Sequence, residues 1–173
     1  MESIFIREAG PADAALVTDI ARRTFVDSFA EQNTAENMRI FLEEQNPREK
    51  QMAEVGAPGR HFLLAYIGDE LAGYVSLRVA GAPAELQGEK AIEIVQLYSE
   101  KKMIGKGVGP ALMQAALDLA QKMGFGWVWL GVWEENHRAH AFYRKWGFER
   151  FGEHVFFVGL DAQTDWWMKK KLG

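Results

Sequence analysis

The sequence predicts a single α/β domain, and three observations support this prediction. The length of 173 residues fits one domain better than two. Short segments that alternate apolar and polar residues, typical of strands, are interspersed with longer segments whose apolar residues recur at three- and four-residue steps, typical of helices. No internal repeat, low-complexity tract or linker interrupts the chain, so we expect one domain over residues 1–173.

The N-terminal part is expected to form one strand and three helices. Residues 3–8 alternate in the manner of a strand. Apolar residues then follow helical spacing over residues 12–30 and again over 34–44. A third helix is expected to begin at Asn46-Pro47, because Asn is a favourable N-cap and Pro suits the first helical position.

The rest of the chain is expected to supply most of the sheet. Residues 61–67 and 70–79 flank Gly68-Asp69, a pair typical of a tight hairpin turn. The remaining expected elements are a loop (80–88), a strand (90–98), a helix (108–123), a strand (127–133), a short helix (136–146) and a closing pair of strands (148–160 and 165–172).

Composition excludes several classes of function. The absence of cysteine excludes a thiolate nucleophile, a disulfide framework and a Cys-based zinc site. The first residues lack the features of a secretory signal, and no apolar run approaches the ~20 residues that cross a bilayer, so we expect a cytoplasmic protein without a membrane partner. The net charge of −4 argues against a nucleic-acid partner and is compatible with a cationic substrate.

The most informative segment is residues 97–109, which leaves a strand and opens an amphipathic helix. Gly105, Gly107 and Gly109 alternate there, which removes the Cβ atoms that would keep a ligand away from the backbone. Successive N–H groups at the positive end of a helix suit a phosphate or pyrophosphate, and Lys106 adds charge nearby.

Other interpretations of this glycine-rich turn stay open. It could simply connect a strand to a helix. The Walker pattern fits less well, because Gly107 stands where Ser or Thr should follow Lys106. The dinucleotide fingerprint requires G-x-G-x-x-G, whereas this turn has G-x-G-x-G. An acidic residue does end the next strand (Glu134 or Glu135), as that fingerprint requires, so this interpretation stays open.

A second motif follows one helix and one strand later. Its residues reproduce the pattern N-x-x-A-x-x-F-Y-x-x-x-G-F of the GCN5-related N-acetyltransferases (GNAT), with Asn136, Ala139, Phe142, Tyr143, Gly147 and Phe148. The upstream turn resembles the pyrophosphate loop of the same family, Q/R-x-x-G-x-G/A, with Gly107 and Gly109 at the small positions. Ile104 replaces the usual Gln or Arg, which removes side-chain support but leaves the backbone amides.

The resemblance implies a GNAT-like domain with a central, mixed, mostly antiparallel sheet flanked by helices. It also implies direct transfer of the acetyl group from acetyl-CoA, as co-substrate and without a metal, to a primary amine. The implied coenzyme-binding residues are Leu97, Tyr98, Ser99, Ile104, Gly105, Lys106, Gly107, Val108, Gly109, Asn136 and Tyr143. Asn136 could also be only a helix N-cap.

The chemistry of this family requires an uncharged amine. An alkylamine with a pKa near 10.4 is protonated at neutral pH, and its deprotonation costs roughly 4–5 kcal/mol. The resemblance implies Glu93 as general base, directly or through water, although Glu93 could instead be a structural or substrate-orienting carboxylate. It implies Tyr143 as the acid that protonates the leaving thiolate, and a backbone N–H of Leu97 or Tyr98 as donor to the acetyl oxygen.

At finer grain the chain resembles the PaiA-type spermidine/spermine N-acetyltransferases, in residues 24–33, 36–38, 129–133 and 163–165. In that group the first helical region contributes to the acceptor cleft, so the resemblance implies Asp27 and Glu31 as residues that hold a cationic acceptor. Both could also be ordinary solvated acids on an amphipathic helix.

The sequence therefore predicts an acetyltransferase of a small cationic amine such as a polyamine. The alternatives are a peptide or protein N-acetyltransferase, or an acetyl-CoA-binding regulatory module with little activity. A homodimer is left open. His137 and His140 have a spacing that could hold a metal, but without a third ligand we expect both to be solvated surface residues.

Overall fold

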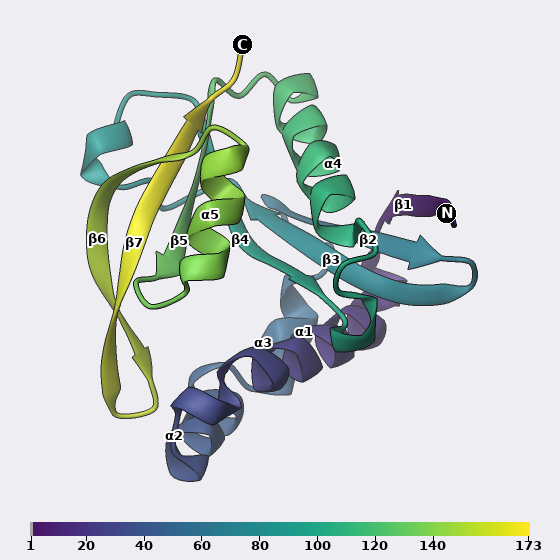
Figure 1. The fold of residues 1–173 in the computed structure, drawn as a ribbon, viewed down its shortest axis with the longest axis vertical. Coiled ribbons are helices and arrows are strands. Elements are labelled where there is room, and N and C mark those ends of the chain that lie inside the picture. The colour runs from purple at the N-terminus through teal and green to yellow at the C-terminus, as the bar shows by residue number, and fades with distance from the viewer. Residues whose placement is uncertain (1) are drawn as a thin grey trace.

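The computed structural model describes residues 2–173, and within them seven strands form one sheet (Figure 1). Their order is β1-β2-β3-β4-β5-β7-β6, and only the β4–β5 pair is parallel. The strands are β1 (Ile4–Glu8), β2 (Arg60–Ile67), β3 (Glu70–Arg78), β4 (Ala91–Ser99), β5 (Trp127–Trp133), β6 (Glu149–Val158) and β7 (Asp161–Lys171). The predicted α/β class and the mixed, mostly antiparallel sheet are confirmed.

Helices cover both faces of this sheet. The α-helices are α1 (Ala14–Phe29), α2 (Ala35–Ile40), α3 (Arg48–Glu54), α4 (Val108–Lys122) and α5 (His137–Lys145). Short 3₁₀ turns are η1 (Pro11–Asp13), η2 (Ala30–Gln32), η4 (Ala84–Leu86) and η5 (Lys101–Met103), and η3 (Phe41–Gln45) is a π-helical stretch. No described helix is both long enough and apolar enough to cross a membrane.

Three expected boundaries were wrong. The third helix has Pro47, not Asn46, at its N-cap and shows no side-chain cap, because the chain stays extended through Pro47 (ψ 161°). The helix expected over 34–44 changes to π-helical geometry at Phe41. The last two strands are joined directly by Gly159-Leu160, since Val158 pairs with Asp161 where a loop was expected.

The two faces of the sheet have separate cores. Alternate strand residues such as Leu77, Ile92 and Leu130 pack under α4, together with side chains of α5. On the opposite face Leu64 and Tyr74 pack against Ile20 of α1. We call these the α4 face and the α1 face.

The sheet is open between β4 and β5. The two strands pair only from Ala91↔Trp127 to Ile94↔Leu130, and they diverge beyond that point (Figure 1). The register between β3 and β4 shifts at the same level, so that Val95 is an extra residue on β4. A β-bulge of this kind bends its strand. The bend turns the second half of β4 away from β5, so the two strands are unpaired beyond Ile94 and Leu130, and we call this divergence the gap.

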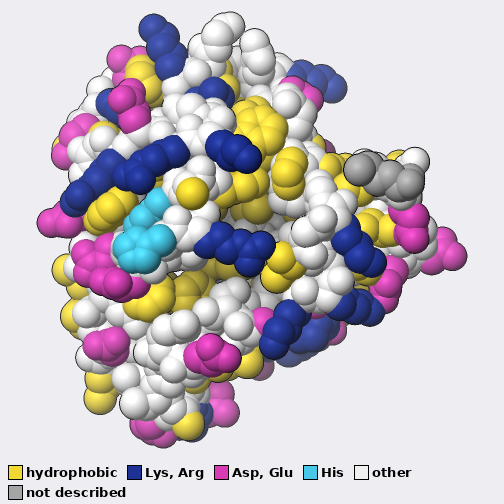
Figure 2. Space-filling model, viewed as in Figure 1, with side chains coloured by type: hydrophobic (Ala, Val, Ile, Leu, Met, Phe, Trp, Pro, Cys, Tyr) yellow, Lys and Arg dark blue, Asp and Glu magenta, His cyan; other side chains and the backbone are white. Residues whose placement is uncertain are grey.

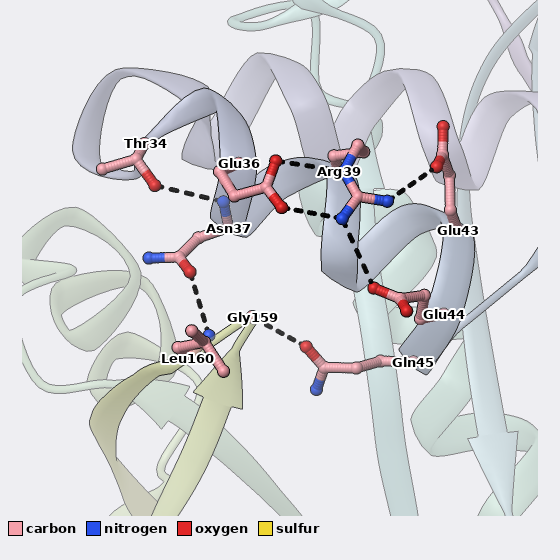
Figure 3. Close-up of polar contacts among 9 residues, drawn as sticks. All are labelled: Thr34, Glu36, Asn37, Arg39, Glu43, Glu44, Gln45, Gly159 and Leu160. Atoms are coloured by element: carbon pink, nitrogen blue, oxygen red, sulfur yellow. Dashed lines mark hydrogen bonds and ion pairs between the residues drawn. The ribbon is translucent and has the colours of Figure 1, made fainter.

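A polar bridge closes the α1 face at the far end of β6 and β7 (Figure 3). Asn37 Oδ1 accepts a hydrogen bond from Leu160 N at 2.9 Å, and Gln45 Oε1 accepts one from Gly159 N at 2.6 Å. Beneath them Val158 is buried against Phe25 and Met38. The segment α2–η3 is therefore fastened to the tip of the β6–β7 hairpin.

We expect Gly159→Ala to break the hydrogen bonds of this bridge. A Cβ at Gly159 would lie 2.6 Å from Asn37 Cα and 2.5 Å from Asn37 Oδ1, closer than real contacts allow. The expected loss of unfolding free energy is about 1–3 kcal/mol in urea denaturation. Gly81→Ala is the matched control, because Gly81 also has positive φ (+73° against +62°) but nothing within 4 Å. Equal losses in the two variants would contradict a specific bridge.

Candidate functional site

The second half of β4 lines one side of the gap with free backbone groups. Glu100 N donates to Ala72 O on β3 at 2.8 Å. In an antiparallel ladder the direction of N–H groups alternates, so the N–H of Tyr98 also points to β3 while those of Leu97 and Ser99 point to the gap. Of the two donors predicted for the acetyl oxygen, the structure thus leaves Leu97 available.

The predicted glycine-rich turn lies where this strand reaches α4. Gly105 and Gly107 have φ values of +87° and +85°, which favour glycine, and Gly107 is the N-cap of α4. The N–H groups of Val108 and Gly109 occupy the first turn and have no acceptor within the helix. No described atom lies within 4 Å of the Cβ position of Gly105, so the turn is open to a ligand.

The α4 helix is held close to the sheet at its N-terminus. Gly73 on β3 permits this approach, because a Cβ there would meet Tyr98 O at 2.7 Å and Val108 Cγ1 at 2.8 Å. The buried side chain of Val108 anchors the first turn. The free amides of the turn are therefore fixed relative to the gap.

Charged side chains surround the turn at the surface. Lys106 is exposed, Lys102 forms an ion pair with Glu70, and Ile104 is 46% exposed. Figure 2 shows apolar side chains gathered in a hollow near the centre of this face, with Lys and Arg side chains around it. Such a rim suits an anionic ligand with an apolar arm.

Helix α5 forms the opposite wall on the α4 face. Its N-cap is Asn136, whose Oδ1 accepts a hydrogen bond from Ala139 N at 3.2 Å, so the capping role is confirmed. Tyr143 packs edge-on against Phe142 and Phe148, with ring centroids 5.5 and 5.8 Å away. Burial raises the pKa of Tyr143 to about 12, which keeps its hydroxyl protonated.

Glu93 lies in the paired part of β4, opposite Trp129 and on the α1 face. Its Oε1 accepts two hydrogen bonds from Arg78, at 2.6 and 3.0 Å. Burial raises the pKa of Glu93, and the opposing effect of Arg78 only reduces that rise. The carboxyl group is thus buried and hydrogen-bonded to Arg78. Glu93 lies one residue before Ile94, where the pairing of β4 with β5 ends.

A second carboxyl group stands at the opening itself and was given no role from sequence. Asp165 on β7 faces the α1 side, because its neighbour Trp166 packs in the α4-face core. His154 on β6 lies opposite it, with Nε2 3.8 Å from Asp165 Oδ2. Both side chains lie over Gly131, the first β5 residue beyond the paired part.

Asp27 and Glu31 are both exposed. Asp27 lines a shallow depression on the outer side of α1, together with Asp19 and three arginines, Arg22, Arg23 and Arg48. The positive charge around this depression does not favour a polycation. The predicted role of Asp27 and Glu31 in acceptor binding stays a prediction.

The histidine pair does not form a metal site. His137 is exposed as expected, but the expectation was wrong for His140, which is 2% exposed. The His140 ring stacks on Trp166 at 4.2 Å, and its Nε2 bonds Trp133 O at 2.9 Å. Among residues 2–173, no group of three or more His, Asp and Glu side chains is arranged to hold a metal ion.

Comparison with known proteins identifies the family. Residues 18–148 match the family described as the acetyltransferase (GNAT) family. An uncharacterized N-acetyltransferase in the pepI 3' region of Lactobacillus delbrueckii subsp. lactis is 36% identical over 172 residues, which cover 99% of both chains. The chain therefore belongs to the acetyltransferase (GNAT) family, whose members transfer acetyl groups. It is an acetyl-CoA-dependent N-acetyltransferase, as the sequence predicts.

More distant relatives have assigned acceptors, and these differ. The spermidine N(1)-acetyltransferase of Thermoplasma acidophilum is 25% identical over 85% of this chain and 89% of its own. The N-alpha-acetyltransferase RimI of Mycobacterium tuberculosis is 30% identical over 64% of this chain and 68% of its own. The acceptor of this chain does not follow from these names.

The fold is shared with a PaiA-type enzyme. The crystal structure of PaiA N-acetyltransferase from Thermoplasma acidophilum in complex with coenzyme A superposes with a TM-score of 0.75 at 23% identity, covering 98% of this chain and 99% of that one. The predicted likeness to PaiA-type proteins is confirmed at the level of the fold.

We expect acetyl-CoA to stabilise the protein through the glycine-rich turn. A ligand a hundredfold above its Kd adds roughly 2.7 kcal/mol to the unfolding free energy. Gly107→Val should remove most of this gain, because a β-branched residue is strained at a φ of +85° and would shift the free amides of the turn. Thermal melting of each variant with and without acetyl-CoA measures the gain.

Gly88→Val is the matched control for this measurement. Gly88 has almost the same φ (+86°) and no described atom within 4 Å of its Cβ position, so both variants carry similar backbone strain. A Gly107→Val protein that keeps the wild-type gain would contradict the proposed place of the pyrophosphate.

Proposed function

We propose that this enzyme acetylates a primary amine of a small cationic molecule, with polyamines such as spermidine as the leading candidates. The observation that carries the proposal is the loss of pairing between β4 and β5 beyond Ile94 and Leu130, which lies between the α4 face and the α1 face. Acetyl-CoA can enter from the α4 face and the amine from the α1 face, so that the two meet directly without a covalent enzyme intermediate.

The coenzyme is expected to lie along the predicted residues. Its pyrophosphate would accept hydrogen bonds from the amides of Gly107, Val108 and Gly109, favoured by the positive end of α4. Its pantetheine arm would continue along the free edge of Leu97 to Ser99. The N–H of Leu97 would then donate to the acetyl oxygen as that oxygen becomes negative in the transition state.

Tyr143 is the proposed acid for the leaving thiolate. Its pKa of about 12 is well above that of an ordinary thiol, near 8.5, so a phenolate does not persist after the proton has moved to sulfur. The nitrogen of the new amide carries a surplus proton at that moment. We propose that this proton restores the Tyr143 hydroxyl.

A carboxylate on the α1 face is needed to take the first proton of the ammonium group. The resemblance to the family implies Glu93, directly or through water. Its Oε2 has no hydrogen-bond partner among residues 2–173, whereas Oε1 is occupied by Arg78. A role for Glu93 as base therefore depends on Oε2 or on a water that it binds.

The size of the acceptor is limited by the polar bridge. The contacts of Asn37 and Gln45 with the β6–β7 hairpin close the α1 face at one end, and Gln163 Nε2 adds a bond to Asn33 Oδ1 at 2.8 Å. A small amine can enter beside such a bridge more readily than a folded protein. The net charge of −4 and the spermidine-acetylating relative also support a small cation.

A peptide N-terminus is the alternative acceptor, supported by the relative named RimI. An acetyl-CoA-binding regulatory module is a further alternative, although Tyr143 stands at its motif position with its hydroxyl protonated. A cytoplasmic location and the question of a homodimer stay predictions of the sequence.

We expect Tyr143→Phe to lower kcat by ~10²–10⁴-fold while the affinity for acetyl-CoA stays nearly unchanged. The reason is that the variant loses only the proton donor. Thiol release in the steady state and thermal melting with acetyl-CoA measure the two quantities. Weaker binding with an unchanged kcat would instead make Tyr143 a binding residue.

A panel of amines tests the acceptor directly. We expect thiol release with spermidine or spermine, and we expect KM to rise between about 0.1 M and 1 M salt, because the Debye length falls from about 10 Å to 3 Å. Good turnover of a peptide and none of any polyamine would refute the substrate class. Release with no amine at all would favour the regulatory module.

Asp27 and Glu31 can be tested in the same assay. If they hold the acceptor, the double variant Asp27→Asn with Glu31→Gln should raise the KM of spermidine several-fold, since exposed ion pairs contribute about 0–1 kcal/mol each. Unchanged spermidine kinetics would show that both are ordinary surface acids.

A further inference from the structure

We infer that Asp165, with His154 beside it, receives the acceptor's ammonium group and takes its first proton. This inference deepens the proposed function and rests on it. It assigns a chemical role to a carboxyl group on the last strand, outside both sequence motifs of the coenzyme site.

The first argument is position. The parallel pairing of β4 and β5 ends at Ile94 and Leu130, so Gly131 is the β5 residue at the opening of the gap. The nearest atoms to a Cβ position on Gly131 are His154 Nε2 at 3.2 Å and Asp165 Oδ2 at 3.5 Å. The absence of a side chain at Gly131 therefore lets both groups stand directly over the opening.

The second argument is that the two possible proton-transfer groups lie on opposite faces. Tyr143 packs in the core of the α4 face, and Asp165 is on the α1 face. Tyr98 is near both groups: its pKa is raised mainly by burial, and the charges of Tyr143 and Asp165 raise it further. An amine arriving beside Asp165 would face a thioester arriving beside Tyr143.

The third argument is the state of the carboxyl group. The Asp165 side chain is 17% exposed and accepts no hydrogen bond within residues 2–173, whereas Glu93 is held by Arg78. Burial raises the pKa of Asp165 to about 6. An incoming ammonium group would supply the missing counter-ion. Binding of a cation would therefore stabilise the ionised form of Asp165.

The groups around Asp165 allow this assignment. His154 stacks on Trp167 with centroids 5.0 Å apart, and burial lowers its pKa, which favours the neutral ring at neutral pH. Tyr98 on β4 is protonated, since its pKa is raised. From α1, Phe29 contacts Tyr98 edge-on at 6.4 Å and carries no charge. None of these neighbours carries a positive charge that could pair with Asp165 in place of the ammonium group.

The proton balance of the reaction is complete. The ammonium gives its first proton to Asp165, which passes it to solvent, and the free lone pair attacks the thioester carbonyl carbon. The C–N bond forms and the C–S bond breaks, and Tyr143 protonates the departing sulfur. The second proton of the nitrogen then restores Tyr143. One amide, one thiol and one released proton result.

The pH dependence of spermidine acetylation tests the inference. In the wild type, kcat/KM should fall tenfold per pH unit below about pH 6, as Asp165 becomes protonated. Asp165→Asn should lower kcat/KM by on the order of 10²-fold at pH 7.5 and abolish this acid limb. Glu93→Gln and His154→Gln should both keep the limb. An acid limb that persists in Asp165→Asn, or that disappears in His154→Gln or Glu93→Gln, overturns the inference.

A stability measurement shows independently whether Asp165 is buried without a partner. The folded-state pKa of about 6 exceeds the ordinary 3.8, so the folded state holds its proton between about pH 4 and 6 and loses stability as pH rises through that window. Asp165→Asn should therefore melt above the wild type by a margin that grows from pH 4 to 6 and then stays constant. A variant that melts below the wild type at pH 7.5 would show that Asp165 already has a partner.

Gly131→Ala tests the positioning. Its Cβ would lie 3.2 Å from His154 Nε2 and 3.5 Å from Asp165 Oδ2, so it should shift His154, crowd Asp165 and raise the KM of spermidine several-fold. Gly126→Ala, immediately before the same strand, is the matched control, because its Cβ would meet only Lys90 O at an ordinary 3.9 Å. Equal KM values in the two variants contradict the placement.

The outcomes separate the two claims. A wild type that acetylates no amine overturns the proposed function and this inference together. An active wild type whose pH profile is unchanged by Asp165→Asn overturns the inference alone.

Discussion

The divergence of β4 from β5 is the constraint on which the rest of the structure depends. Two parallel strands normally satisfy each other's backbone along their whole length. Here the extra residue Val95 ends that pairing after Ile94, and it leaves the N–H groups of Leu97 and Ser99 directed at an open gap. Buried backbone groups require partners. Leu97 and Ser99 are half-buried, and the proposed coenzyme would supply partners for their N–H groups, so a loss of sheet pairing can serve as a binding site.

The surrounding elements keep this opening in one shape. Gly73 allows α4 to approach β3 closely, so the free amides at Gly107 stay aligned with the gap. Asn136 caps α5, and His140 ties the same helix to the end of β5 through Trp133 O. On the other face, Asn37 and Gln45 fasten the helical segment to the hairpin. The contacts of α5 are local, whereas those of Asn37 and Gln45 join segments more than a hundred residues apart, so the α1 face of the site depends on long-range folding.

The sequence predicted the coenzyme side of the site well, because that side is encoded in contiguous segments. The turn around Gly107 and the helix that carries Asn136 and Tyr143 need only local geometry. The acceptor side could not be predicted in this way. Whether Asp165 and His154 meet depends on the register of β6 and β7, which shifts between Arg150 and Gly152 and whose turn at Gly159 is stabilised by residues more than a hundred positions away. The N-cap expected at Asn46 was wrong for a local reason, since the backbone stays extended through Pro47 and the helix begins one residue later.

A crystal structure with coenzyme A bound is the most direct test of this account. We expect the pyrophosphate on the amides of Gly107 to Gly109, the pantetheine arm along Leu97 to Ser99, and the sulfur in the opening between Leu97 and Gly131 with the Tyr143 hydroxyl beside it. A pyrophosphate bound elsewhere, for instance in the arginine-lined depression on the outer side of α1, would contradict the central claim that the opened strand pair is where the coenzyme and the amine meet.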